Sequence, residues 1–252
     1  MESLTIGSGK PKLIVCITSQ NILELSTDIK SVGSIYDILE WRADQFIGFA
    51  DMSIEAVKSA ASLMKKPLLF TYRTKSEGGA GDITVEEYTA LNKRVLDAEI
   101  AELIDIEYNT MGEALTELVD YAHAKGVKAL ASMHDFEKTP SKEEIIAHLN
   151  KLQAAGDISK IAVMPKSEDD VITLVEALLD FRRDFAKKPY IGISMSKLGF
   201  ITRAAAEFFS CAAVYASLGK LGAPGQVDAE TMMQFLDEVH SLIQDERRKS
   251  CK

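Results

Sequence analysis

Cysteine is scarce in this chain: its 252 residues include only Cys16, Cys211 and Cys251. An odd number of widely spaced cysteines matches neither a disulfide framework nor a zinc-binding pattern, so the sequence predicts a reducing compartment. The first twelve residues, MESLTIGSGKPK, lack the charged start and apolar core of a signal peptide. No apolar run approaches the length needed to span a membrane. We therefore expect a soluble, cytoplasmic protein.

An excess of positive charge is also missing. The formal net charge is −9, which argues against a general binding surface for nucleic acid or for a membrane, although it leaves room for a local basic pocket. The chain has no linker, low-complexity block or shift in composition, and 46% of its residues are apolar. A chain of this length can bury a substantial core. The sequence predicts a single domain over residues 1–252.

The chain does contain one repeated unit, in which a short apolar run is followed by a polar turn and an amphipathic helix. Short continuous apolar runs between turn residues are typical of strands that are buried on both faces. We predict strands within eight runs, at residues 13–19, 36–42, 67–73, 103–108, 128–136, 160–165, 189–195 and 212–218.

Helical patterns lie between these runs. Residues 111–126 place apolar residues at three- and four-residue spacing and end at Gly126, which suits a helix C-terminus. Residues 141–156 open with Ser141 and carry Glu144 three residues later, the pattern of a capping box. Residues 227–243 supply the last helix.

Alternation of strands and helices indicates parallel strands with right-handed crossovers. Eight such units in a chain of this length predict an α/β fold, a (β/α)8 TIM barrel. The alternative is an open, doubly wound sheet, which usually carries a glycine-rich turn after its first strand. The corresponding turn here, ITSQNI at 17–22, has no glycine. We therefore favour the barrel.

Charged and polar residues gather at the predicted carboxyl ends of the strands, where the active sites of such barrels form. Taken singly they have ordinary interpretations, since arginines at strand ends often pair with nearby acids. Segment 76–82, SEGGAGD, is not a phosphate-binding loop, because it lacks Gly-Lys-Ser/Thr. Taken together, they predict a pocket for a small anionic, hydroxylated substrate. These residues are Glu40, Arg42, Arg73, Glu77, Asp105, Glu107, His134, Asp135, Arg203 and Gln226.

Lys160 stands near the start of the sixth run, and lysine is rarely buried without a partner. One interpretation places it at the barrel rim with its ammonium in water. The other points it into the pocket, but alternation alone does not decide whether its face of the strand is the inner one. Inside the pocket it would be desolvated and close to arginines, which favours a neutral amine. Such an amine can form a Schiff base with a carbonyl, and a nearby histidine could move a proton.

Six fragments in this order resemble type I 3-dehydroquinate dehydratases, over a span from about Lys12 to Gln226. They are EWRAD (40–44), YRTKSEGG (72–79), SMHDF (132–136), KIAVMP (160–165), GFITR (199–203) and APGQ (223–226). The resemblance implies a (β/α)8 enzyme without metal or cofactor, commonly a homodimer. It implies the removal of water from 3-dehydroquinate to give 3-dehydroshikimate, in the shikimate pathway of aromatic amino-acid biosynthesis.

The resemblance also assigns roles to matching positions. Lys160 matches the lysine that forms the Schiff base. His134 matches the general base that takes the C2 proton and then protonates the departing C1 hydroxyl, and Glu77 matches the carboxylate that orients this histidine. The other matches concern the substrate: Glu40, Arg42 and Arg73 for its hydroxyls, Arg203 and Gln226 for its carboxylate end, and Asp105 as a supporting residue.

Two positions depart from the family pattern. Gly222 stands where the family usually has a serine that contacts the carboxylate end of the substrate, and Cys16 stands where strand one often has a serine. We expect both changes to affect substrate affinity more than the chemistry.

Two other functions stay open at this point. Another Schiff-base barrel lyase, such as an aldolase, would share the lysine but should not need His134, Arg203 and Gln226 together. A catalytically silent barrel that only binds a small acid would not need the set of Lys160, His134 and Glu77.

Overall fold

The computed structural model describes residues 5–64, 67–218 and 224–250. Eight strands form one parallel sheet in the order β7-β6-β5-β4-β3-β2-β1-β8. At the two ends of this order, the Ala212 amide donates to the Tyr190 carbonyl (2.7 Å), which joins β7 to the chain just before β8. The strands are β1 (Lys12–Ile17), β2 (Ile38–Arg42), β3 (Leu68–Thr71), β4 (Leu103–Glu107), β5 (Lys128–Asp135), β6 (Ile158–Val163), β7 (Tyr190–Ser194) and β8 (Ala213–Ser217).

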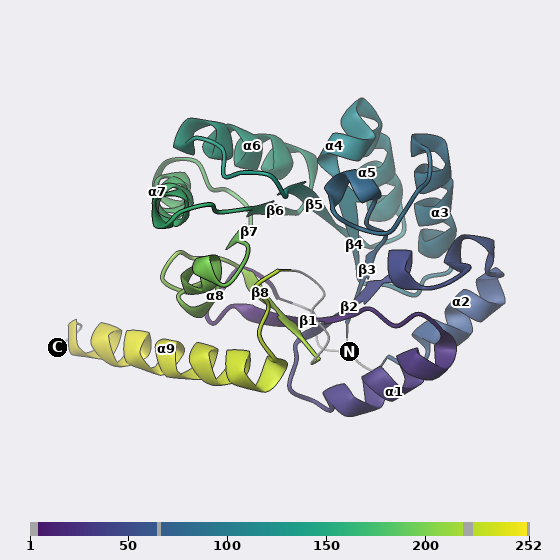
Figure 1. Ribbon diagram of the computed structural model, residues 1–252, viewed down its shortest axis with the longest axis horizontal. Helices are drawn as coiled ribbons and strands as arrows, with labels where there is room; N and C mark the ends of the chain where they lie inside the picture. The colour runs from purple at the N-terminus through teal and green to yellow at the C-terminus, as the bar shows by residue number, and fades with distance from the viewer. Residues whose placement is uncertain (1–4, 65–66, 219–223, 251–252) are drawn as a thin grey trace.

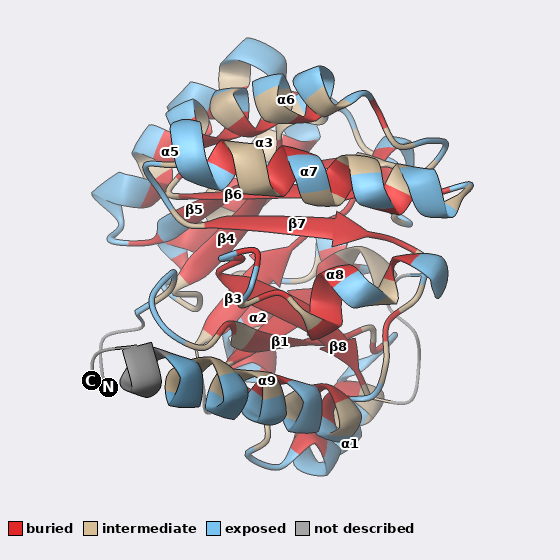
Figure 2. Cartoon of the chain, turned by 90° about the vertical axis from the view of Figure 1, so that its left-hand side faces the viewer, coloured by how far each residue is buried: buried red, intermediate tan, exposed pale blue. Residues whose placement is uncertain are grey.

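Helices surround the strands on the outside (Figure 1), with exposed outer faces over a buried barrel (Figure 2). No helix within the described residues is both long enough and apolar enough to cross a membrane. The helices are α1 (Ile22–Val32), α2 (Ile54–Ala61), α3 (Val85–Asp97), α4 (Tyr108–Met111), α5 (Leu115–Ala124), α6 (Lys142–Ala155), α7 (Glu168–Asp184), α8 (Ile201–Ala204) and α9 (Ala229–Ser250), with short 3-10 turns η1 (Ala43–Gln45), η2 (Phe49–Asp51), η3 (Lys75–Glu77), η4 (Gly112–Ala114) and η5 (Leu198–Phe200).

The predicted barrel is confirmed, and each of the eight predicted runs overlaps a strand, although β1 and β6 begin one and two residues before their runs. The capping box of α6 forms as expected, with reciprocal hydrogen bonds between Ser141 and Glu144. The prediction of one helix over 111–126 was wrong in its first part. Gly112 has a φ of +52°, which is not helical, so α4 ends before it and α5 begins at Leu115.

A layer of apolar side chains fills the amino-terminal part of the barrel interior. Each strand contributes one inward residue to this layer, and all of them are almost completely buried. The alternate residues of the same strands point outward and pack against the helices. The inward layer consists of Ile14, Ile38, Leu69, Leu103, Leu130, Ile158, Ile191 and Ala213.

Two residues further along each strand, the next inward layer is mostly polar. Because side chains alternate with a period of two, these residues point to the same interior space, above the apolar layer. They are Cys16, Glu40, Thr71, Asp105, Ser132, Lys160, Ile193 and Tyr215. The fold therefore places a buried polar layer on an apolar floor.

Candidate active site

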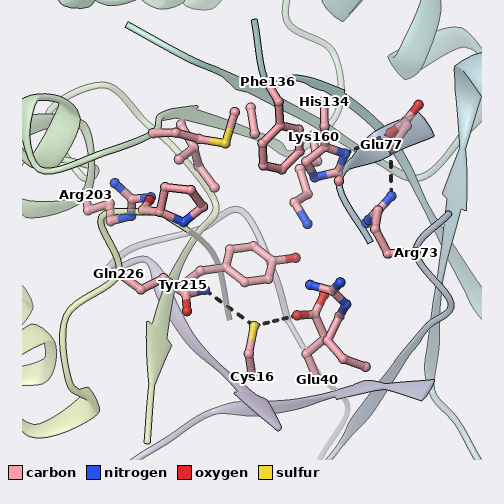
Figure 3. A pocket seen from close by; sticks show the side chains of 16 residues that line it. Cys16, Glu40, Arg73, Glu77, His134, Phe136, Lys160, Arg203, Tyr215 and Gln226 are labelled. Atoms are coloured by element: carbon pink, nitrogen blue, oxygen red, sulfur yellow. Dashed lines mark hydrogen bonds and ion pairs between the residues drawn. The ribbon is translucent and has the colours of Figure 1, made fainter. Parts of the chain in front are cut away.

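A pocket lies above the polar layer, at the carboxyl ends of the strands (Figure 3). Its empty volume, which includes space open to solvent, is about 600 Å³. Asp105 lies beneath the pocket rather than in its wall, and Gly222 lies outside the described residues. The wall includes nine of the predicted site residues: Cys16, Glu40, Arg42, Arg73, Glu77, His134, Lys160, Arg203 and Gln226.

Lys160 points into the barrel, which answers the question that its sequence left open. Its side chain is 6% exposed, and its Nζ lies 3.5 Å from Oδ2 of Asp105. The nearest charged partner is thus a carboxylate, whereas the sequence suggested only arginines. Nζ also lies 4.2 Å from the centroid of the Tyr215 ring. These contacts hold the amine at the bottom of the pocket.

His134, from β5, is paired with Glu77. Its Nδ1 lies 2.8 Å from Oε2 of the carboxyl group; the Glu77 side chain is buried, and that of His134 is 9% exposed. Burial lowers the pKa of His134 well below its usual value, and the positive charges of Arg73 and Lys160 add to the effect. Burial raises the pKa of Glu77 to about 8, against the opposing charge of Arg73. The imidazole is therefore neutral near pH 7.

Glu77 owes its position to a tight turn after β3. Five backbone hydrogen bonds hold this turn, including one from the Gly81 amide to the Arg73 carbonyl (3.0 Å). A Cβ on Gly79 would lie only 2.2 Å from the same carbonyl oxygen, so this position requires glycine. The glycines of the SEGGAGD segment thus allow two parts of the backbone to pass close to each other. The resulting turn brings Glu77 within hydrogen-bonding distance of His134.

Arg73 lies in a buried cluster of acids. Its guanidinium contacts Asp105 at 2.7 Å, Glu107 at 3.1 Å and Glu77 at 3.6 Å. It also donates to Ser132 Oγ at 2.9 Å. Burial alone would raise the pKa of Asp105, but the charges of Arg73 and Lys160 lower it below its usual value. Although Arg73 lines the pocket, its donors are largely taken up by protein groups.

Arg203 differs from the other two pocket arginines. Arg42 forms a bidentate pair with Asp44, through contacts of 2.8 and 2.9 Å. Arg203, which α8 positions, is only 2% exposed and donates to the backbone carbonyls of Ser194 and Pro224. Within the described residues no carboxylate pairs with it, and burial lowers its pKa to about 10. Such a cation is suited to an anionic group of a ligand.

Cys16 and Gln226 form another part of the pocket wall, next to Glu40. The thiol of Cys16 hydrogen-bonds Oε2 of Glu40, and Gln226 Nε2 donates to Cys16 Sγ at 3.6 Å. The other oxygen of Glu40 accepts from Thr71 Oγ1 at 2.9 Å. Burial raises the pKa of the Cys16 thiol well above its usual value, and the charge of Glu40 adds to the effect. The cysteine is therefore a neutral hydrogen-bonding group.

Glu107, which the sequence placed among the pocket candidates, binds Arg73. Sequence reasoning gave no role to three other residues that the structure brings to the site: Ser132 binds Arg73, Asp44 binds Arg42, and Tyr215 lies against Lys160. Most of them could have been identified from the sequence, because they lie two residues after the inward apolar residue of their strand and so point to the same side. In the described parts of the chain, no group of three or more His, Cys, Asp or Glu side chains is arranged to hold a metal ion.

Together these features define a class of protein: a (β/α)8-barrel enzyme whose pocket combines a buried lysine, a histidine–carboxylate pair and a guanidinium with no carboxylate partner among the described residues. Comparison with known proteins narrows the class. The family model of type I 3-dehydroquinase matches residues 13–243. The chain belongs to this family.

Individual relatives agree with this assignment. The chain is 42% identical to a 3-dehydroquinate dehydratase of Escherichia coli (strain 55989 / EAEC) over 248 residues, covering 95% of this chain and 97% of the relative. A type I 3-dehydroquinate dehydratase structure from Clostridium difficile, solved with covalently modified comenic acid, superposes with a TM-score of 0.90 and 38% identity, covering 95% and 96% of the two chains. The 3-dehydroquinate dehydratase structure from Geobacillus kaustophilus HTA426 gives a TM-score of 0.87 and 30% identity, with coverages of 94% and 93%.

Proposed function

We propose that this chain removes water from 3-dehydroquinate to give 3-dehydroshikimate, a step of the shikimate pathway, through a Schiff base on Lys160. The observation that carries the proposal is that the buried amine of Lys160 shares one pocket with the His134–Glu77 pair. An amine can form the imine, and the neutral imidazole can move the proton. The Clostridium difficile relative was solved with covalently modified comenic acid, which supports a covalent step in the proposed reaction.

The proposed reaction begins when the neutral amine of Lys160 adds to the C3 ketone, and loss of one water gives the imine. The protonated imine withdraws electrons from the C2–H bond, so that His134 can take this proton. The resulting enamine expels the C1 hydroxyl, which receives the proton from His134 and leaves as water. Hydrolysis of the imine then consumes one water and frees the lysine. The net change is the loss of one water from the substrate.

The remaining pocket residues are proposed to orient the substrate. The unpaired guanidinium of Arg203 would bind its carboxylate, with Gln226 at the same end. Glu40 and Arg42 would bind ring hydroxyls at the end of the pocket away from Arg203. Arg73 and Asp105, which contact each other beneath the pocket, would keep Lys160 and the neighbouring side chains in place. In this assignment Arg73 acts mainly through its carboxylate partners.

We further propose that the chain, as a single domain, forms a homodimer in the cytoplasm and has no nucleic-acid partner. Family membership supports these proposals. The dimer is also supported by exposed apolar side chains on and beside α8 and on α9, including Ile201, Phe208 and Leu242. Light scattering after gel filtration tests the dimer, and a mass of one chain at micromolar concentration would contradict it.

Two measurements on the intact protein test the catalytic proposal. The first follows the absorbance of the conjugated enone product after addition of 3-dehydroquinate. The second adds borohydride with the substrate, which should reduce the imine to a stable secondary amine and add the mass of one ligand. Peptide mapping should place the adduct on Lys160, and Lys160→Ala should abolish it.

Lys166 is the control for this trapping. It is exposed just beyond Pro165, at the far end of the same segment. An adduct on Lys166, or turnover without any adduct, would remove the Schiff-base mechanism. An adduct without enone formation would favour a different Schiff-base lyase.

A further inference from the structure

Tyr215 is a pocket residue to which the mechanism above assigns no role. It is the central residue of β8, and it belongs to the polar layer at the level of Lys160. The residue is 3% exposed, and its side chain lines the pocket. In Figure 3 its ring extends from the side of Gln226 and Arg203 toward the side where Glu40 and Arg73 lie.

The hydroxyl of Tyr215 is buried and has no hydrogen-bond partner among the described residues. Buried phenols usually find a partner, because an unpaired polar group in the interior is costly. Two other buried phenols follow this rule: the Tyr88 hydroxyl donates to the Asp105 carbonyl and the Tyr190 hydroxyl to the Phe209 carbonyl. The hydroxyl of Tyr215 is thus a donor without a partner among the described residues, on a side chain that lines the pocket.

The ring fixes where this donor lies relative to the reacting atoms. Its centroid is 4.2 Å from Nζ of Lys160, so the phenol lies against the nitrogen that the proposed mechanism joins to the substrate. Burial keeps the phenol neutral, because it raises its pKa well above the usual value, and the nearby charge of Glu40 adds to the effect. A neutral phenol next to the bound carbonyl carbon can donate a hydrogen bond to a substrate oxygen.

We propose that the hydroxyl of Tyr215 donates a hydrogen bond to the substrate hydroxyl on the carbon next to the ketone, on the side away from the leaving group. This inference rests on the proposed function. If the ketone carbon meets Lys160 and the carboxylate meets Arg203, that hydroxyl must point away from Arg203. This is the direction in which the Tyr215 hydroxyl points in Figure 3. Tyr215 is then a substrate-binding residue that helps to select hydroxylated rings.

Tyr215→Phe tests the proposal, because it removes the hydroxyl and keeps the ring beside Lys160. We expect KM for 3-dehydroquinate to rise about 3- to 10-fold with kcat nearly unchanged, the range for loss of one neutral hydrogen bond. The melting temperature of the free enzyme should stay the same or rise, because the lost hydroxyl has no protein partner. Borohydride trapping on Lys160 should persist.

Tyr190→Phe is the matched control. It removes an equally buried hydroxyl that does have a partner, at 2.6 Å, and that packs outside the barrel interior. It should lower the melting temperature and leave KM unchanged. An unchanged KM in Tyr215→Phe would overturn the proposal. So would a raised KM with a lowered melting temperature, since the hydroxyl would then be structural.

A separate readout distinguishes failure of this inference from failure of the proposed function. Calorimetric titration with 3-dehydroshikimate, which retains the hydroxyl in question, needs no turnover. Weaker binding to Tyr215→Phe than to the unmodified protein supports the contact. Equal binding overturns it even if the enzyme is active, whereas an unmodified protein that gives no enone and no adduct overturns the proposed function itself.

Discussion

Nδ1 of His134 lies 2.8 Å from Oε2 of Glu77, and the group that carries the proton between them decides whether Nε2 of the neutral imidazole is protonated. When Glu77 is protonated, its O–H donates to Nδ1, and the proton of the neutral imidazole then sits on Nε2. When Glu77 is ionised, Nδ1–H donates to the carboxylate and Nε2 is free to accept a proton. The base form of the site therefore requires ionised Glu77.

The first prediction is a pH profile. The pKa of Glu77 is raised to about 8, so its ionised fraction grows as the pH increases through that value. We expect kcat/KM to rise about tenfold per pH unit below pH 8 and to level off above it. Steady-state kinetics from pH 6 to 10 measure this rise. Glu77→Gln should lower the plateau value of kcat/KM and abolish its rise with pH. If the rise persists in Glu77→Gln, another group is responsible for it.

The second prediction concerns His134. His134→Ala should reduce turnover by about two to four orders of magnitude, the usual contribution of a positioned acid–base group. Borohydride trapping on Lys160 should continue, since the amine is untouched. His123→Ala is the control, because that ring is exposed and bonds Asp157 away from the pocket. Near-normal turnover in a folded His134→Ala protein would show that another group moves the proton.

The third prediction concerns stability. Arg73→Met would leave the buried acids around it, among them Asp105 and Glu107, without their main cation. Removing one partner of a buried ion pair typically costs about 3–5 kcal/mol, so we expect a loss of this size in the free energy of unfolding. Urea denaturation measures it. Arg183→Met, which removes an exposed arginine paired with Asp180 and Asp184, should leave the unfolding free energy nearly unchanged.

The sequence was sufficient to predict the barrel, because each strand run is short, apolar and followed by a helix. It was also sufficient to place Glu40 and His134 toward the carboxyl ends of their strands and Arg203 in the segment that follows β7. It could not decide the direction of Lys160, because a strand buried on both faces shows no alternation of polar and apolar residues. The pairing of Lys160 with Asp105 and its contact with Tyr215 depend on the register of distant strands, which local patterns do not determine.

The fourth prediction concerns Cys16. A serine hydroxyl is a stronger donor and acceptor than a thiol, and this position faces Glu40 and Gln226 in the pocket wall. Cys16→Ser should therefore lower KM by a few-fold with little change in kcat. Cys211→Ser, at a buried cysteine in the outer core, should change stability but not KM. A raised KM in Cys16→Ser would mean that the cavity is shaped for sulfur.

The last prediction follows from the isolated charge of Arg203. Its guanidinium is 2% exposed and lacks a carboxylate partner within the described residues, so the free protein bears the cost of a buried cation that an anionic ligand would offset. Arg203→Met should raise KM at least 100-fold, because a charge-assisted hydrogen bond pair to the substrate carboxylate is lost. The same change should leave the melting temperature of the free protein equal or higher, whereas added 3-dehydroshikimate should stabilise only the unmodified protein. A lower melting temperature together with an unchanged KM would show instead that Arg203 serves the fold through its bonds to the carbonyls of Ser194 and Pro224.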